Sequence, residues 1–67
     1  MEKFAQRLKE LRQERGLSIQ ALAKQVNIGS SSLCRWENNQ AIVNGVQLIV
    51  LAKFFDVSVD YLLGLED

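Results

Sequence analysis

The sequence contains no histidine and only one cysteine, and these shortages exclude several kinds of site. An intramolecular disulfide cannot form, and no credible zinc site remains, so we expect neither a metal nor another cofactor. The longest apolar run, at 48–52, is far shorter than the roughly 20 residues of a membrane span. No charged-then-apolar leader opens the chain, which favours a soluble, cytoplasmic protein that is not secreted.

Catalytic motifs are also missing. The sequence has no glycine-rich phosphate loop and no pair of carboxylates in a plausible pocket, so we predict that the protein is not an enzyme. Cys34 is read as an ordinary small residue, because its neighbour Arg35 alone is weak support for an activated, redox-sensing thiol.

Net charge is zero, which counts against a nucleic-acid binder, but the charges are unevenly distributed. Residues 1–35 carry seven basic and three acidic side chains, whereas residues 36–67 carry one basic and five acidic side chains. A chain charged in this way can turn a basic face towards phosphates and keep its acidic half turned away.

Apolar spacing and capping residues predict helices at 2–15, 18–26, 30–37, 45–55 and 59–63. The four later helices share a hydrophobic staple, in which the residue before the N-cap pairs with the residue five positions later. The pairs are Leu17 with Leu22, Ile28 with Leu33, Val43 with Leu48 and Val57 with Leu62. The sequence therefore predicts an all-α protein, a compact five-helix bundle that forms a single domain over residues 1–67.

Residues that favour turns separate the predicted helices. Gly64 ends the last helix as a left-handed cap. Only three residues separate the second and third helices, and Asn27 among them tolerates the positive φ that a sharp turn requires.

In the first helix Glu10 lies at helical spacing from Arg7, which predicts a solvated, ion-paired surface.

The stretch GSSSLCRWE at 29–37 predicts a short helix with two different edges. Leu33 and Trp36 form an apolar edge, and small or polar side chains form the other. A helix this short is unstable alone, so the other helices must hold it in place. Because an α-helix fits the major groove of DNA, we predict that the polar edge is presented to base edges there.

Four segments, RLKELRQERGLS, ALAKQVNI, SSLCRWENN and LAKFFDVSVDYLLG, resemble in order and spacing the lambda-repressor, Cro and XRE type of helix-turn-helix domain. The resemblance covers nearly the whole chain. It implies a lambda repressor-like fold that binds double-stranded DNA at a two-fold symmetric operator, commonly as a homodimer. It also implies a transcriptional repressor or regulator that is cytoplasmic and nucleoid-associated.

The resemblance assigns roles to individual residues. Ser30, Ser31 and Arg35 match base-reading positions, and the guanidinium of Arg35 can donate two hydrogen bonds to a guanine. Contacts with the DNA backbone are expected from Ser18, Gln20, Ser32 and Asn38. Arg12 and Glu37 match a partly buried ion pair that joins the first and third helices.

Two departures from the family pattern reduce the number of contacts that we expect with the phosphate backbone of DNA. Ile19 stands where the family usually carries glutamine after the cap, so Gln20 or the backbone amides would have to make that contact. The loop at 39–43 has no charge, whereas family loops are commonly basic there. We therefore expect weaker DNA binding than is usual for the family.

The helix at 45–55 is apolar over more of its surface than one small core can cover. Val46, Val50 and Phe54 share a face, and we place them with Ile42 at the contact between two copies; a single wide core stripe is the alternative. A second function stays open, namely a protein-interaction module on the same fold that has weakened or lost DNA binding and binds a partner protein through this face. The sequence also allows the DNA-binding end of a longer repressor.

Overall fold

The computed structural model describes residues 2–67, and five helices account for most of them. They are α1 at Glu2–Glu14, α2 at Ile19–Val26, α3 at Ser30–Glu37, α4 at Gly45–Phe55 and α5 at Val59–Leu63. The predicted all-α fold is confirmed, and only the end of α1 and the start of α2 differ from prediction, each by one residue. Within this range no helix has the length and apolar character that crossing a bilayer requires.

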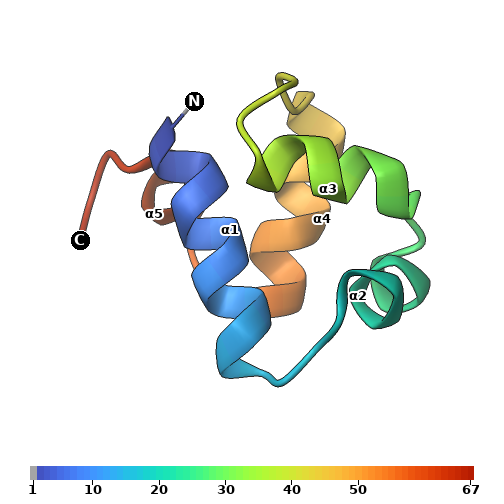
Figure 1. The fold of residues 1–67 in the computed structure, drawn as a ribbon. Helices are drawn as coiled ribbons and strands as arrows, with labels where there is room; N and C mark the ends of the chain where they lie inside the picture. The colour runs from blue at the N-terminus through green and yellow to red at the C-terminus, as the bar shows by residue number, and fades with distance from the viewer. Residues whose placement is uncertain (1) are drawn as a thin grey trace.

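The first and last helices, α1 and α5, lie side by side, so the two ends of the fold are in contact (Figure 1). The short helix α3 packs against α1 and α2, while α4 packs against α2 and α5. Because α3 is supported from two sides, the rest of the bundle fixes its orientation.

The helix starts follow the local capping pattern. Side-chain oxygens accept hydrogen bonds from backbone amides at three of the four later starts: Ser18 from Ala21 at 3.0 Å, Asn44 from Gln47 at 2.8 Å and Ser58 from Tyr61 at 2.9 Å. Such a cap stabilises a helix by about 1 kcal/mol. Gly29, which has no side chain to offer, begins α3 without one.

Among residues 2–67, positive φ angles occur at two predicted turn positions, at Gly16 after α1 with φ 67°, and at two further positions. Asn27 has φ 56°, and Gly64 has φ 80°, as the sequence predicted. A Cβ atom at Gly64 would lie 2.5 Å from Cβ of Lys3, so only glycine fits where α5 ends against α1. Asn39 and Asp56 also adopt positive φ, which the sequence did not predict.

All eight staple residues belong to the core or pack against it, which supports the predicted helix starts. The side chains with less than 2% exposure are Phe4, Leu8, Leu22, Leu33, Leu51 and Leu62. The ring of Phe4 meets Trp36 edge to face, with centroids 6.3 Å apart, which joins α1 to α3. The core therefore lies beneath α3 and holds its apolar edge.

Arg7 does not form the solvated ion pair with Glu10 that the helical spacing predicted. Its side chain is mostly buried, and its guanidinium donates hydrogen bonds to the carbonyl oxygens of Tyr61 and Glu66. It also lies 4.3 Å from the centre of the Tyr61 ring and 3.7 Å from a carboxylate oxygen of Asp67. The prediction was wrong because the end of the chain folds back over α1.

Candidate nucleic-acid interface

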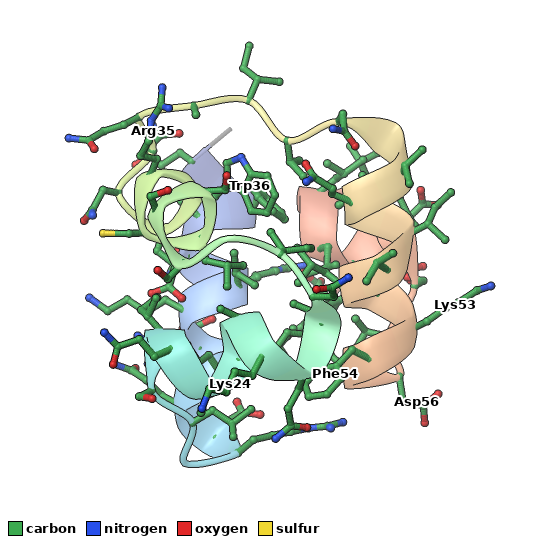
Figure 2. The ribbon with its side chains drawn as sticks, turned by 90° about the vertical axis from the view of Figure 1, so that its right-hand side faces the viewer. Lys24, Arg35, Trp36, Lys53, Phe54 and Asp56 are labelled. Atoms are coloured by element: carbon green, nitrogen blue, oxygen red, sulfur yellow. The ribbon has the colours of Figure 1, made fainter. Side chains whose placement is uncertain are left out.

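The helix α3 has one buried edge and one exposed edge. Leu33 is fully buried and Trp36 is 4% exposed. Figure 2 shows the Trp36 side chain directed into the bundle and that of Arg35 directed away from it. The exposed residues of the other edge are Ser30, Ser31, Cys34 and Arg35, while Ser32 is half-buried. A helix held in this way can place its exposed edge in the major groove of DNA, which is wide enough for an α-helix.

The Arg12–Glu37 pair connects α1 to the last residue of α3. Nε of Arg12 donates to Oε2 of Glu37 at 2.7 Å, and Nη2 donates to Oε1 at 3.0 Å. Nη1 of the same arginine donates to the backbone oxygen of Leu17 at 2.7 Å. The side chains of Arg12 and Glu37 are only 13% and 6% exposed, so the two charges are largely removed from water.

These contacts act on the charge of Arg12. Hydrogen bonding to Glu37 raises the pKa of the Arg12 guanidinium, against the opposing effect of burial. Arg12 therefore stays charged, and its three bonds fix the C-terminal end of α3 relative to α1 and to the loop that leads into α2. The helix α3 is thus held by polar bonds at one end as well as by the core.

The start of α2 offers two exposed polar side chains. Ser18 is the N-cap, and its hydroxyl oxygen accepts from the amide of Ala21. Gln20 is exposed, whereas Ile19 is half-buried and packs against the core. Of the two side chains that follow the cap, Gln20 is thus the one free to reach a phosphate.

The side chain of Asn38 is exposed, but it already makes hydrogen bonds within the protein. Its Nδ2 donates to the backbone oxygen of Cys34 at 2.9 Å and lies 3.4 Å from the sulfur of the same residue. Phosphate oxygens accept hydrogen bonds, so a backbone contact through Asn38 has to use the second hydrogen of its amide or replace the bond to Cys34.

A second exposed surface begins in the loop before α4 and continues along that helix. It consists of four aliphatic residues, called below the α4 apolar face: Ile42 at 83% exposure, Val46 at 74%, Ile49 at 48% and Val50 at 37%. Ile49 was not predicted for this surface, although its position three residues after Val46 places the two side chains next to each other on a helix.

Phe54 does not join the exposed residues of the α4 apolar face. It is half-buried, packs against the core and meets the ring of Phe55 at 5.0 Å and 81°. The guanidinium of Arg15 lies 5.0 Å from the centre of the Phe54 ring. A charged side chain from the turn after α1 therefore shields this ring, and Phe54 lies at most at the margin of a contact with another protein.

In the view of Figure 2, Arg35 on α3 and Lys53 on α4 lie at opposite sides of the bundle. Both side chains are exposed. The exposed edge of α3 and the outer surface of α4 are therefore separate surfaces.

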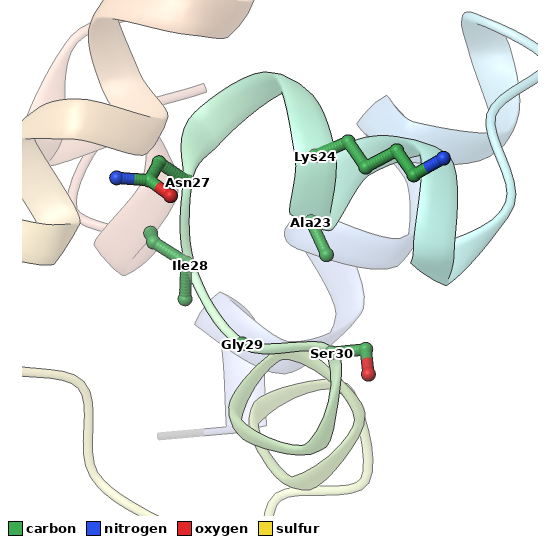
Figure 3. Close-up of a pocket in the computed structure, with 6 residues that line it drawn as sticks. All are labelled: Ala23, Lys24, Asn27, Ile28, Gly29 and Ser30. Atoms are coloured by element: carbon green, nitrogen blue, oxygen red, sulfur yellow. The ribbon is translucent and has the colours of Figure 1, made fainter.

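A cavity of about 300 Å³ opens between α2 and α3, beside the turn at residues 27–29 (Figure 3). This turn is called the elbow below, and the cavity is called the elbow cavity. Its lining residues are Ala23, Lys24, Asn27, Ile28, Gly29 and Ser30. Figure 3 shows Lys24 and Ser30 extending to one side, with Ala23 between them. From the sequence, Lys24 was one of the seven basic residues of the N-terminal half, with no predicted contact of its own.

With α2 and α3 joined through residues 27–29 and packed against each other, the bundle has the architecture of a lambda repressor-like helix-turn-helix domain. Residues 8–62 match the model of the HTH_3 helix-turn-helix family, and the chain belongs to this DNA-binding family. This family is the XRE type of helix-turn-helix domain, and the HTH-type relatives of the chain include transcriptional regulators.

One sequence relative is the uncharacterized HTH-type transcriptional regulator YobD of Bacillus subtilis (strain 168). It is 39% identical over 64 residues, which are 96% of this chain and 57% of YobD. The HTH-type transcriptional regulator ImmR of the same strain is 36% identical over 96% of this chain and 50% of its own length. The chain thus spans about half the length of these relatives.

The fold is similar to that of two regulators of known structure. The restriction-modification controller protein C.AhdI from Aeromonas hydrophila superposes with a TM-score of 0.82 at 36% identity, over 91% of this chain and 92% of C.AhdI. SinR, a master regulator for biofilm formation, has been solved in complex with DNA and superposes with a TM-score of 0.82 at 34% identity, over 90% of this chain and 97% of SinR. A second structure holds SinR in complex with the SinI protein.

Proposed function

We propose that this protein binds a specific double-stranded DNA sequence as a transcriptional repressor or regulator, with α3 inserted in the major groove. The carrying observation is the division of α3 into a buried edge, Leu33 and Trp36, and a free edge that ends in Arg35. The structure of SinR with DNA supports the proposal, because SinR shares the fold and a third of its residues with this chain.

In this proposal Arg35 reads a base, and Ser30 and Ser31 make shorter contacts beside it. The guanidinium can donate to O6 and N7 of a guanine, a pairing that discriminates between bases by about 1 to 3 kcal/mol. The hydroxyl groups of the serines are short and adaptable, so they add less selectivity. Ser18, Gln20, Ser32 and Asn38 position the domain on the phosphate backbone.

We further propose that two copies bind one operator through the α4 apolar face. Four exposed aliphatic side chains are unfavourable in water, and burying them against a second copy removes that cost. None of the four carries a charge, so the surface can face a copy of itself across a two-fold axis. The domain would then act as one folded unit over residues 1–67, in the cytoplasm and at the nucleoid.

Selection of bound duplexes from a randomised DNA pool, at two salt concentrations, tests this function. We expect an enriched palindrome with half-sites about one helical turn apart, since two copies of α3 would enter successive major grooves. Binding that depends on salt but shows no sequence preference would contradict operator recognition.

The second candidate function is a protein-interaction module on the same fold. The exposure of Ile42 and Val46 favours it, and so does the uncharged loop at 39–43. SinR, which is seen with the SinI protein, gives a precedent for a partner protein on a relative of this fold. Failure to enrich any DNA sequence would favour this function over operator binding.

A further inference from the structure

Within the part of the chain that the structure describes, the charge of Lys24 has no ion-pair partner. Lys24 is exposed on α2, and the ion pairs found within residues 2–67 involve Arg7 and Arg12 instead. It is also the only charged residue among the six that line the elbow cavity, so no carboxylate in that lining offsets it. The cavity therefore has a positive rim.

The geometry of the rim suits a group with several acceptor oxygens. The ammonium of Lys24 comes from α2 and the hydroxyl of Ser30 from α3, and Figure 3 shows both side chains directed to the same side of the elbow. An ammonium group has three hydrogens to donate. The hydroxyl of Ser30 can donate its one hydrogen to the phosphate while its oxygen accepts from a neighbouring base edge. Ser30 also lies on the exposed edge of α3, so a ligand at this rim adjoins the proposed reading surface.

Few other charges are available on the helix-turn-helix pair. Residues 18–38 contain Lys24, Arg35 and Glu37 as their only charged side chains, and Glu37 is already bonded to Arg12. Arg35 is the residue that we assign to a base. Because the loop at 39–43 has no cation, contact with the phosphate backbone has to come from elsewhere.

We propose that the rim of the elbow cavity, formed by Lys24 and Ser30, binds a phosphate of the DNA backbone beside the base that Arg35 reads. This inference rests on the proposed function and adds to it a phosphate contact on α2. Lys24 is then a positioning residue, which sets affinity and register but carries no sequence information.

The test measures the dissociation constant for duplex DNA over a range of salt concentrations. We compare the parent protein with Lys24→Gln, which removes the charge, with Lys24→Arg, which keeps it, and with Lys53→Gln as a matched control on α4. Both lysines are exposed, so all variants should melt like the parent. The logarithm of the binding constant falls linearly as the logarithm of the salt concentration rises. We expect Lys24→Gln to make this slope shallower by about one unit and to leave base preference unchanged.

Lys24→Arg and Lys53→Gln should keep the slope of the parent. A slope for Lys24→Gln equal to that for Lys53→Gln would overturn the assignment, and so would a changed base preference. The slope can be measured on any duplex that the protein binds. A parent that binds DNA without sequence preference would therefore contradict the operator while still testing Lys24, and a parent that binds no DNA would overturn both proposals.

Discussion

Arg12 of α1 and Glu37 of α3 meet through two parallel hydrogen bonds, of 2.7 and 3.0 Å, in a site almost closed to water. Such a fork fixes both the distance and the plane of the two groups. Because Glu37 is the last residue of α3, the pair links the orientation of that helix to the stability of the bundle.

Removing one partner of this pair should destabilise the protein strongly. Glu37→Ala leaves the guanidinium of Arg12 buried without its carboxylate, and such a loss costs about 3 to 5 kcal/mol. Thermal unfolding measures the effect, with Glu10→Ala on the exposed side of α1 as the control. A Glu37→Ala protein that melts like the control would mean that the pair adds nothing to stability.

The contribution of Arg12 to stability should not change with pH across the neutral and mildly alkaline range. The pKa of Arg12 is raised in the folded state, so its contribution is present below the pKa of the unfolded chain and disappears only as pH rises through the folded value, which is strongly alkaline. The difference in unfolding free energy between the parent and Arg12→Met should therefore be constant from about pH 7 to 10. Urea titrations at several pH values measure it, and a difference that shrinks as pH rises within that range would contradict the assignment.

Arg35→Ala should relax the preference for one base pair in each half-site, at a cost of about 1 to 3 kcal/mol for the preferred sequence. Arg35→Lys keeps the charge but loses the planar fork, so it should relax the same position. Binding to a panel of single-base variants of the selected duplex measures both effects. An unchanged base profile in the two proteins would remove Arg35 from recognition.

Val46→Glu should yield a monomer if the α4 apolar face joins two copies, because it buries like charges against each other near the two-fold axis. Val46 is 74% exposed in one copy, so the fold should tolerate the change. Sedimentation velocity measures the outcome, and Gln13→Glu, which adds the same charge on exposed α1, is the control. If both variants sediment like the parent, the contact between copies lies elsewhere.

Gly64→Ala should destabilise the protein, whereas Gly45→Ala should not. Gly64 has a positive φ, which costs other residues roughly 1 to 2 kcal/mol, and its Cβ would collide with Lys3. Gly45 lies in the first turn of α4 with open space around it, so alanine there should be neutral or stabilising. Gly64→Ala should melt below the parent, and Gly45→Ala at or above it. Equal melting temperatures for the two variants would contradict the close contact between α5 and α1.

The helix starts could be predicted because their signals are local. Each staple and its cap lie within six residues. Ser18, Asn44 and Ser58 can therefore be recognised as N-caps without knowledge of the rest of the fold. The division of α3 into two edges could be predicted for the same reason, because Leu33 and Trp36 are three residues apart and so lie on one side of a helix.

Other features depend on how distant segments meet, and no local pattern contains them. Arg7 finds its acceptors 54 and 59 positions away. Phe54 follows Val46 by eight residues, and at 3.6 residues per turn that separation rotates it by about 80° from the exposed face towards the core. The elbow cavity and the place of Lys24 on its rim likewise arise only when α2 and α3 pack together.

The contact between α1 and α5 has a consequence for the order of folding. Bringing Arg7 to Tyr61 closes a loop of nearly the whole chain, which costs more conformational entropy than the short loop between α2 and α3. We therefore expect the α2–α3 pair to form early and the seam between the two ends to close last. Changes at that seam, such as Gly64→Ala, should then speed unfolding more than they slow refolding.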